Sequence, residues 1–280
     1  MTGFAPEWLS LREGADHRAR DAGLLAALAK HFSARDAVIV VDLGAGLGSN
    51  LRATAPALPA RQHWVLVDYD PVLLAGACEA IASWADQVRP ATAGLEVMKA
   101  GRSIRVEVRH ADLATDPSAF VAHAPDLVTA AALFDLVSEE WIGRFTAALA
   151  ASRVPLYAVL DYDGTNAWSP PHPADAAIVA AFNRHQGGDK GFGSAAGSRA
   201  TELLAERLAA AGYRIERAAS PWRLGAGEAA LLRVLTQGFA EAVRETGEVP
   251  VATIEAWLRA RMADGVTCTV GHEDILALPR

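Results

Sequence analysis

The sequence is poor in cysteine, in clustered basic residues and in long apolar segments, and each scarcity argues against a class of protein. Its two cysteines, Cys78 and Cys268, are too few for a disulfide framework and too distant for a zinc knuckle. No Lys/Arg-rich run interrupts a formal net charge of -7, so nucleic acid and anionic membranes are not expected partners. No segment reaches the length of a membrane span and the first residues lack a signal-peptide pattern, so we expect a cytoplasmic protein.

The sequence does contain enough apolar residues for one large core, since 51% of its 280 residues are hydrophobic. Short β-branched runs alternate with segments of helical periodicity, which is typical of a parallel sheet covered by helices on both faces. Strands are expected at residues 38–42, 64–67, 104–108, 126–133 and 156–160, and helices between them at 49–58, 71–88 and 138–151.

Acidic residues end or follow several of these expected strands. They are Asp42, Asp68, Asp112 and Asp161, and residues 129–135 end a further strand. Ligands of open parallel sheets bind beyond the carboxyl ends of the strands. We therefore expect these residues to converge on one functional edge of the sheet.

After Asp161 the regular alternation stops. Residues 163–198 form a Pro/Gly-rich segment around one expected helix, 173–186. The segment 185–193, which is glycine-rich from residue 187, suits either a loop that closes over a substrate or an exposed turn. Later elements are expected as a helix at 199–211, a strand at 213–219, helices at 227–246 and 250–263, and a last strand from residue 266.

The first expected strand ends in a glycine-rich turn, DLGAGLG at residues 42–48. Its spacing argues against a nicotinamide dinucleotide site. A G-x-G-x-x-G fingerprint starting at Gly44 needs glycine where Ser49 stands, and one starting at Gly46 needs it where Leu51 stands. A phosphate-binding P-loop is excluded because no Gly-Lys-Ser/Thr follows the turn.

The ordered set VVDLGAGLGSN, LVDYDP, HADL and DLVTAAALFDLVS resembles the class I S-adenosylmethionine-dependent methyltransferases. The motifs cover residues 38–162, and the order of elements extends the resemblance over the rest. It implies an α/β fold with a Rossmann-like seven-stranded sheet, mostly parallel, whose last strand, VTCTVGHEDILAL, is antiparallel. Two helices precede that strand where the family often has a short hairpin, which suggests a lid or a dimer surface.

This resemblance implies S-adenosyl-L-methionine as cofactor. Asp68 would accept hydrogen bonds from the ribose hydroxyls, Asp112 would accept one from the adenine amino group, and Asp42 would orient the glycine turn or the cofactor's ammonium group. The expected cofactor-binding residues are Arg20, Asp42, Gly44, Ala45, Gly46, Gly48, Asn50, Asp68, Tyr69, Asp70, Asp112 and Leu113.

An N-terminal helix precedes this core, and family members commonly fold such a helix over the cofactor. On that resemblance Arg20 or Arg12 would bind the cofactor's carboxylate. The alternative is a solvated ion pair between Asp16 and Arg20, which stand four residues apart.

The acceptor side is harder to interpret, because the sulfonium methyl is reactive enough that positioning alone supplies much of the acceleration. The candidate catalytic residues are Asp161, Asp163, His172 and Asp135. Two carboxylates at residues 161 and 163 suit a cationic amine, a proton or a divalent metal. Asp135 faces the substrate or caps the helix that follows, and His172 and His185 are candidate bases or surface residues. We expect no metal site, since Asp161, Asp163 and His172 form no recognisable ligand motif.

We therefore expect transfer of a methyl group to an oxygen or nitrogen atom of a small-molecule acceptor. The alternatives are a non-catalytic S-adenosylmethionine-binding protein that acts through a partner or a homodimer, and aminopropyl transfer to a polyamine. The expected single domain comprises a helical cap (1–34), a cofactor-binding core (35–162), a substrate-lid insert (163–198), further core (199–225), a helical insert (226–263) and a final strand (264–280).

Overall fold

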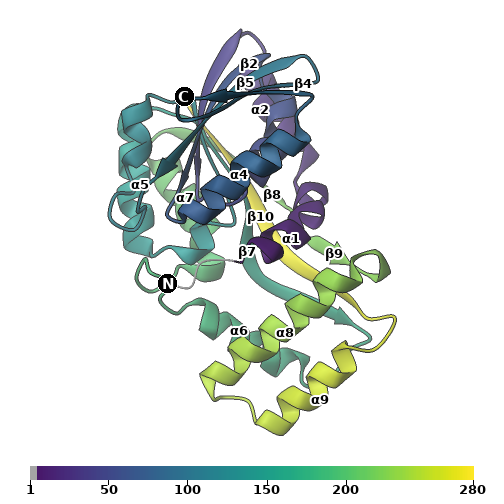
Figure 1. The fold of residues 1–280 in the computed structure, drawn as a ribbon. Helices are drawn as coiled ribbons and strands as arrows, with labels where there is room; N and C mark the ends of the chain where they lie inside the picture. The colour runs from purple at the N-terminus through teal and green to yellow at the C-terminus, as the bar shows by residue number, and fades with distance from the viewer. Residues whose placement is uncertain (1–4) are drawn as a thin grey trace.

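The computed structural model describes residues 5–280, so residues 1–4 of the expected cap lie outside the described part. Its centre is one mixed sheet of ten strands, not seven, with helices on both faces (Figure 1). The strands are β1 Ala37–Leu43, β2 Arg61–Asp68, β3 Gln87–Ala91, β4 Gly94–Lys99, β5 Arg102–His110, β6 Leu127–Ala131, β7 Leu156–Ser169, β8 Tyr213–Ala219, β9 Trp222–Leu224 and β10 Thr267–Pro279.

The strand order is β3-β4-β5-β2-β1-β6-β7-β10-β8, and β9 pairs with β10. Strands β5, β2, β1, β6 and β7 are mutually parallel, whereas β10 is antiparallel to both β7 and β8. The predicted Rossmann-like sheet with an antiparallel last strand is therefore confirmed. The carboxyl ends of the parallel strands also meet at one edge, as the sequence predicted.

The strands beyond the expected seven are the hairpin β3–β4 and the short β9. The expected helix 71–88 ends early, because Val88 lies in β3 and the helix stops at Trp84. The residues of β3 are exposed or half-buried. An edge strand of this kind has no buried face, so it lacks the apolar alternation by which a strand is recognised in a sequence.

Helices cover both faces of the sheet in two groups. On one face, α2, α3 and α4 pack against side chains such as Val40 and Trp64, and on the other α5 and α7 pack against Val41 and Val65. Successive residues of a strand point to opposite faces, which is why neighbouring valines of β1 serve different cores. The helices are α1 Pro6–Ala19, α2 Ala22–Phe32, α3 Ser49–Thr54, α4 Pro71–Trp84, α5 Glu139–Ser152, α6 Asp175–Gln186, α7 Ala200–Ala210, α8 Ala229–Thr246 and α9 Val251–Arg261.

A ribbon formed by β7 and β10 extends beyond the sheet and supports a third core (Figure 1). The strand predicted at 156–160 continues to Ser169, because Thr267–Val270 of β10 pairs with Asn166–Ser169. Helices α6, α8 and α9 pack on this ribbon around Trp168, Phe239 and Trp257. The expected helical insert thus builds a lobe at the same end of the sheet as the carboxyl edge.

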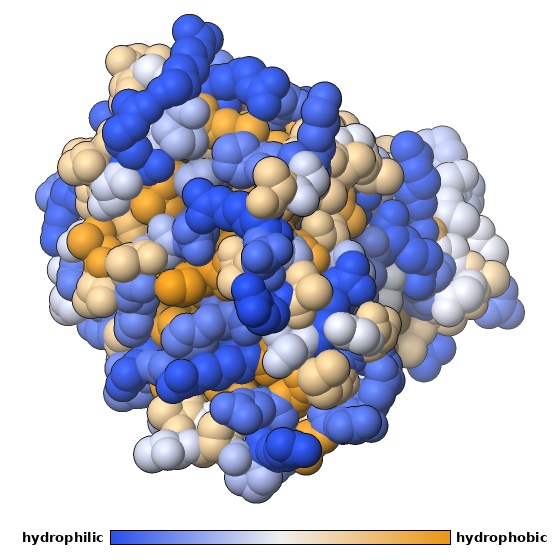
Figure 2. All heavy atoms as spheres, turned by 90° about the horizontal axis from the view of Figure 1, so that it is seen from above, coloured by the Kyte–Doolittle hydropathy of each residue, from blue (hydrophilic) through white to orange (hydrophobic). Residues whose placement is uncertain are grey.

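The opposite end of the sheet carries the amino ends of the parallel strands. Figure 2 shows this face, where hydrophilic residues and smaller apolar areas are interspersed. Over residues 5–280, no helix combines the length and hydropathy that crossing a bilayer requires. The two cysteines are unpaired, with Cys78 half-buried and Cys268 buried.

Candidate functional site

The glycine turn is held against the end of β2 by backbone hydrogen bonds. Gly44, Gly46 and Gly48 have φ angles of 64°, 51° and 71°, a left-handed conformation that glycine adopts without steric cost. The N–H of Ala45 donates to the carbonyl of Val67 at 3.1 Å. A Cβ at position 46 would also stand 3.2 Å from a methyl carbon of Leu9 on α1. The N-terminal helix thus lies over the turn.

Asp68 at the end of β2 has its carboxylate fixed by two backbone donors. Its Oδ2 accepts from the N–H of Gly46 at 2.8 Å, and its Oδ1 accepts from the N–H of Asp70 at 2.9 Å. Burial raises the pKa of Asp68, while these hydrogen bonds oppose the rise. Each carboxylate oxygen has about two acceptor positions, so each keeps one for a ligand hydroxyl.

Asp42 lies beneath the turn in a buried polar network. Its Oδ1 accepts from Asn50 Nδ2 at 2.6 Å, and the same nitrogen donates to Thr129 Oγ1 at 3.0 Å. Its other oxygen has no hydrogen-bond partner among residues 5–280. Burial raises the pKa of Asp42 to about 7, against the hydrogen bond from Asn50 and the positive charge of Arg20. This arrangement links the first strand to the helix that follows the turn.

The raised pKa of Asp42 predicts a pH dependence of stability in the cofactor-free protein. The folded state holds this proton more tightly than the unfolded state, so the contribution is present below pH 4 and is lost as the pH rises through about 7. The loss is at most about 4 kcal/mol from this group. We expect Asp42→Asn to flatten the decline in unfolding free energy between pH 5 and pH 8, measured by urea titration. Parallel profiles for the two proteins would contradict the buried, protonated carboxyl.

Arg20 and Arg12 occupy different surroundings. Arg20 is buried, and its Nη1 donates to Asn50 Oδ1 at 2.8 Å and to Thr54 Oγ1 at 3.2 Å. Arg12 instead forms a two-nitrogen ion pair with Asp16, at 2.9 and 3.1 Å. The alternative pairing of Asp16 with Arg20 is therefore wrong. The reason is that α1 ends at Ala19, so Arg20 leaves the helical spacing.

The remaining expected cofactor residues lie along the ends of β2 and β5. Tyr69 is exposed, with its ring 6.0 Å from that of His110. Asp70 caps α4 by accepting from the N–H of Val72 at 2.8 Å. Asp112 accepts from the N–H of Ala114 at 2.9 Å. Leu113 is buried and its carbonyl accepts from the indole of Trp141 at 2.6 Å.

Asp135, just after β6, and Asp161, within β7, form a pair of neighbouring acidic side chains. Asp161 Oδ1 accepts from the N–H of Phe134 at 2.9 Å, next to Asp135. Burial raises the pKa of Asp135 to about 6, against the charge of Arg12. Burial, reinforced by the charge of Asp135, raises the pKa of Asp161 well above its usual range. Ser138 caps α5, so the capping alternative for Asp135 is wrong.

A further cluster, formed by His272, Tyr162, Trp222 and Arg12, is linked to the acid pair through the charge of Arg12, and its histidine was not predicted from the sequence. His272 of β10 stands opposite Tyr162 of β7, with ring centroids 6.4 Å apart, and 5.0 Å from the ring of Trp222. The guanidinium of Arg12 lies over Trp222 at 4.9 Å. Burial and then the charge of Arg12 lower the pKa of His272 to about 3, so its imidazole is neutral. The polar residues 271–274 (GHED) inside an otherwise apolar strand could have indicated a functional position in the sequence.

The other acceptor candidates lie apart from this pair. Asp163 Oδ1 accepts from both the N–H and the hydroxyl of Thr165, at 2.7 and 2.6 Å. His172 borders a hollow of about 520 Å³ between α6 and α9. His185 pairs with Glu245 of α8 at 2.9 Å. The acid pair of this edge is thus Asp135 with Asp161, and His172 belongs to the helical lobe.

The glycine-rich stretch 187–193 lies against the sheet end and is partly fixed. Phe192 packs edge-on to Trp141, with ring centroids 6.0 Å apart. Two residues after this stretch, Ala195 forms an isolated antiparallel β-bridge with Ser138, which caps α5. This stretch therefore borders the segment that carries Asp135.

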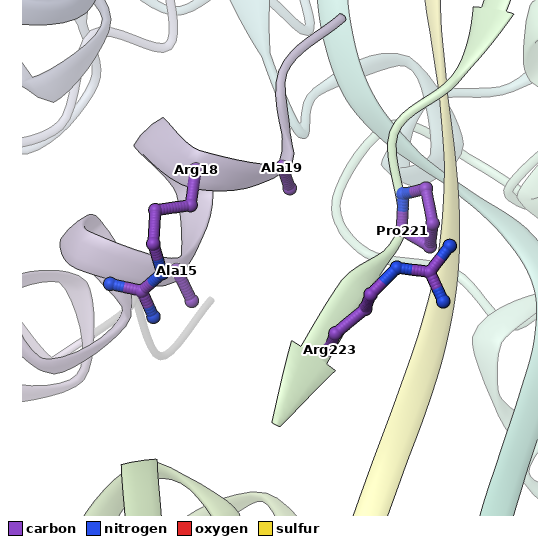
Figure 3. Close-up of a pocket in the computed structure, with 5 residues that line it drawn as sticks. All are labelled: Ala15, Arg18, Ala19, Pro221 and Arg223. Carbon is purple, nitrogen blue, oxygen red and sulfur yellow. The ribbon is translucent and has the colours of Figure 1, made fainter. Parts of the chain in front are cut away.

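A second hollow, of about 300 Å³, opens between α1 and the start of β9 (Figure 3). Its lining consists of Ala15, Arg18, Ala19, Pro221 and Arg223. Arg18 also pairs with Glu228 at 2.6 Å. This hollow contains neither member of the acid pair. No group of three or more His, Cys, Asp or Glu side chains suited to a metal ion occurs within the described part of the chain.

Comparison with known proteins bears on the fold. No protein family profile and no curated protein matches the sequence. A cyclopropane-fatty-acyl-phospholipid synthase-like protein from Lactobacillus casei is similar in structure, with a TM-score of 0.52 and 13% identity over 95% of this chain and 91% of its own. A SAM-dependent methyltransferase from Geobacter sulfurreducens, in complex with S-adenosyl-L-homocysteine, matches with a TM-score of 0.46 and 15% identity over 99% of each chain. Together with the sheet topology, the likeness to the Lactobacillus casei protein shows a Rossmann-like α/β fold.

Proposed function

We propose that the protein is an S-adenosylmethionine-dependent methyltransferase acting on a small molecule through an oxygen or nitrogen atom. The observation that carries the proposal is the fixed pair of the glycine turn and Asp68, joined by the 2.8 Å hydrogen bond from Gly46. This pair stands at the carboxyl edge of a parallel sheet, where open sheets bind their ligands.

The residues fit this cofactor on two grounds. The three glycines hold the turn in a left-handed conformation without side chains of their own, and the Asp68 carboxylate keeps acceptor positions beside it for the two ribose hydroxyls. Asp112 and the Leu113 backbone would hold the adenine, while Asp42 and Asn50 would keep the turn in place. The bound cofactor would supply an electrophilic methyl group on a sulfonium centre.

The chain's own contribution would be to orient an acceptor and exclude water from it. Helix α1 lies over the glycine turn and also carries Arg12, whose charge reaches Asp135. The same helix thus contacts the cofactor turn and brings a positive charge toward the acid pair. Holding two reactants in line contributes several kcal/mol to the acceleration of such a displacement.

Methyl transfer is tested by incubating the protein with methyl-labelled S-adenosylmethionine and a broad small-molecule extract. We expect label in a small molecule together with S-adenosylhomocysteine. Release of methylthioadenosine in its place would indicate aminopropyl transfer. Saturable cofactor binding without transfer to any compound would indicate the non-catalytic alternative and contradict the proposal.

Asp161→Asn is expected to lower kcat at least about tenfold while changing the affinity for S-adenosylhomocysteine less than about threefold. The substituted amide keeps an oxygen to accept from the N–H of Phe134, so the local backbone retains its hydrogen bond. Steady-state kinetics and calorimetry measure the two effects. Equal losses in both would remove Asp161 from the acceptor side.

A further inference from the structure

The acid pair at the sheet edge contains carboxylate oxygens that nothing in the described chain satisfies. Asp135 Oδ1 and Asp161 Oδ2 have no hydrogen-bond partner within residues 5–280, although the two residues are only 8% and 1% exposed. The charge of Arg12 reaches Asp135, but its guanidinium already binds both carboxylate oxygens of Asp16. Buried carboxylates of this kind are costly unless a cation or proton accompanies them.

His272 is a further buried residue with an unpartnered polar atom. Nδ1 of His272 has no hydrogen-bond partner in the described structure, and the residue is 5% exposed. Arg12 acts on both His272 and Asp135, and Asp135 acts in turn on Tyr162, whose ring stands beside His272. The histidine and the acid pair therefore share one set of neighbours. A neutral imidazole adds a hydrogen-bonding group to this place and no charge.

The rings of Tyr162 and Trp222 complete the surroundings. Their ring centroids lie 6.4 and 5.0 Å from that of His272. Aromatic faces attract cations through the ring quadrupole, and the guanidinium of Arg12 already uses this attraction on Trp222. Uncompensated buried carboxylates favour an organic cation over an anion or an uncharged alcohol.

We propose that Asp135 and Asp161 bind the ammonium group of an amine and take a proton from it, which makes the methyl acceptor an amine. The inference rests on the proposed methyltransferase function and narrows its acceptor to nitrogen. The unpartnered Oδ1 of Asp135 and Oδ2 of Asp161 are the atoms that receive the ammonium hydrogens.

The proton balance is simple. The ammonium N–H bond breaks, its proton forms an O–H bond on the pair, and the electron pair stays on nitrogen as the lone pair that a methyl transfer requires. After release of the product, the pair returns the proton to water. The raised pKa of both acids makes the carboxylates better proton acceptors than ordinary ones.

The charged or titratable groups facing them are Arg12 and Asp16 of α1, Tyr162 of β7, and His272 and Asp274 of β10.

The binding step is tested without turnover, by thermal unfolding at pH 8 with saturating S-adenosylhomocysteine. The probe is 100 mM methylammonium chloride against potassium chloride at equal ionic strength. Methylammonium is the smallest primary ammonium ion, so a site that accepts an amine group cannot exclude it by size. We expect it to raise Tm by roughly 2 °C in the unmodified protein.

Asp161→Asn and Asp135→Asn are expected to abolish this rise. Glu273→Gln is the matched control, because it removes a carboxylate of the same ribbon that is partly exposed and already paired with Arg217 at 2.7 Å. It should respond as the unmodified protein does. Absence of a methylammonium effect, or an equal effect in all four proteins, overturns the amine site.

The second arm examines the product of the labelled extract experiment. We expect the labelled compound to bind a cation-exchange resin at pH 7 and to carry its methyl group on nitrogen. Label in a neutral or anionic compound overturns the inference while leaving methyl transfer intact. A methylammonium effect without any labelled product would instead contradict the proposed function and keep the cation site.

Discussion

Replacing Asp68 by alanine is expected to reduce the affinity for S-adenosylmethionine at least about 100-fold. Hydrogen bonds to a charged acceptor contribute about 1.5–3 kcal/mol each, and the variant loses two of them to the ribose. It also releases the N–H of Gly46 from its 2.8 Å hydrogen bond, so the glycine turn loses its connection to this carboxylate. Isothermal titration calorimetry at neutral pH measures the change.

Asp68→Asn separates the two consequences, because the amide retains one acceptor oxygen for a backbone N–H and presents a donor where the second oxygen stood. We expect an intermediate loss of affinity. Glu96→Gln is a suitable control, since it removes an exposed carboxylate from strand β4. An unchanged affinity in Asp68→Ala would remove this residue from the ribose role and with it the main support for the cofactor site.

Asp274→Ala is expected to lower the free energy of unfolding by about 3–5 kcal/mol. Asp274 is buried on β10 and accepts from the N–H of Leu160 and the N–H of Asp21, each at 2.9 Å, and from Ser220 Oγ at 2.5 Å. It thereby joins β7, the start of α2 and the segment before β9. Leu160 has a φ of 62°, a strained conformation for leucine that this hydrogen bond maintains.

The hydrogen bond from Leu160 to Asp274 also fixes the position of Asp161, because Asp161 follows Leu160 directly. Asp274→Asn keeps an acceptor oxygen for Leu160 and Ser220 but faces the N–H of Asp21 with a donor, so we expect a smaller loss than in the alanine variant. Glu273→Ala, one residue away and ion-paired near the surface, should cost less than about 1 kcal/mol. Urea unfolding of the three variants measures these values. Equal small losses of unfolding free energy in the three variants would show that the hydrogen bonds of Asp274 do not stabilise the fold.

Much of the fold was predictable because its signals are local. The glycine turn and the buried strands are encoded by contiguous residues, and strand β8 coincides with the predicted range 213–219, whereas the antiparallel direction of the last strand was implied by the family resemblance. Two features were missed for a physical reason. The hairpin at Val88 is exposed at the sheet edge, and the second half of β7 is polar because it pairs with β10 outside the main core.

Sequence motifs allowed candidate residues to be proposed for the cofactor, whereas the acceptor-side residues could be proposed only in part. Asp161 and Asp135 were proposed from their places after strands, but their pairing depends on burial and on Arg12 from α1, which lies more than a hundred residues away in the sequence. His272 stands on the last strand and reaches the pair only through the antiparallel register with Tyr162. Such contacts arise from topology, and no spacing within the chain encodes them.

The central claim is tested most directly by a crystal structure of the protein with S-adenosylhomocysteine. We expect the ribose hydroxyls to bind the Asp68 carboxylate beside Gly46, with the adenine next to Asp112. The sulfur should lie on the side of the edge that carries Asp135 and Asp161. Occupancy of any other site, or no occupancy at saturating concentration, would contradict the assignment of this edge as the site of methyl transfer.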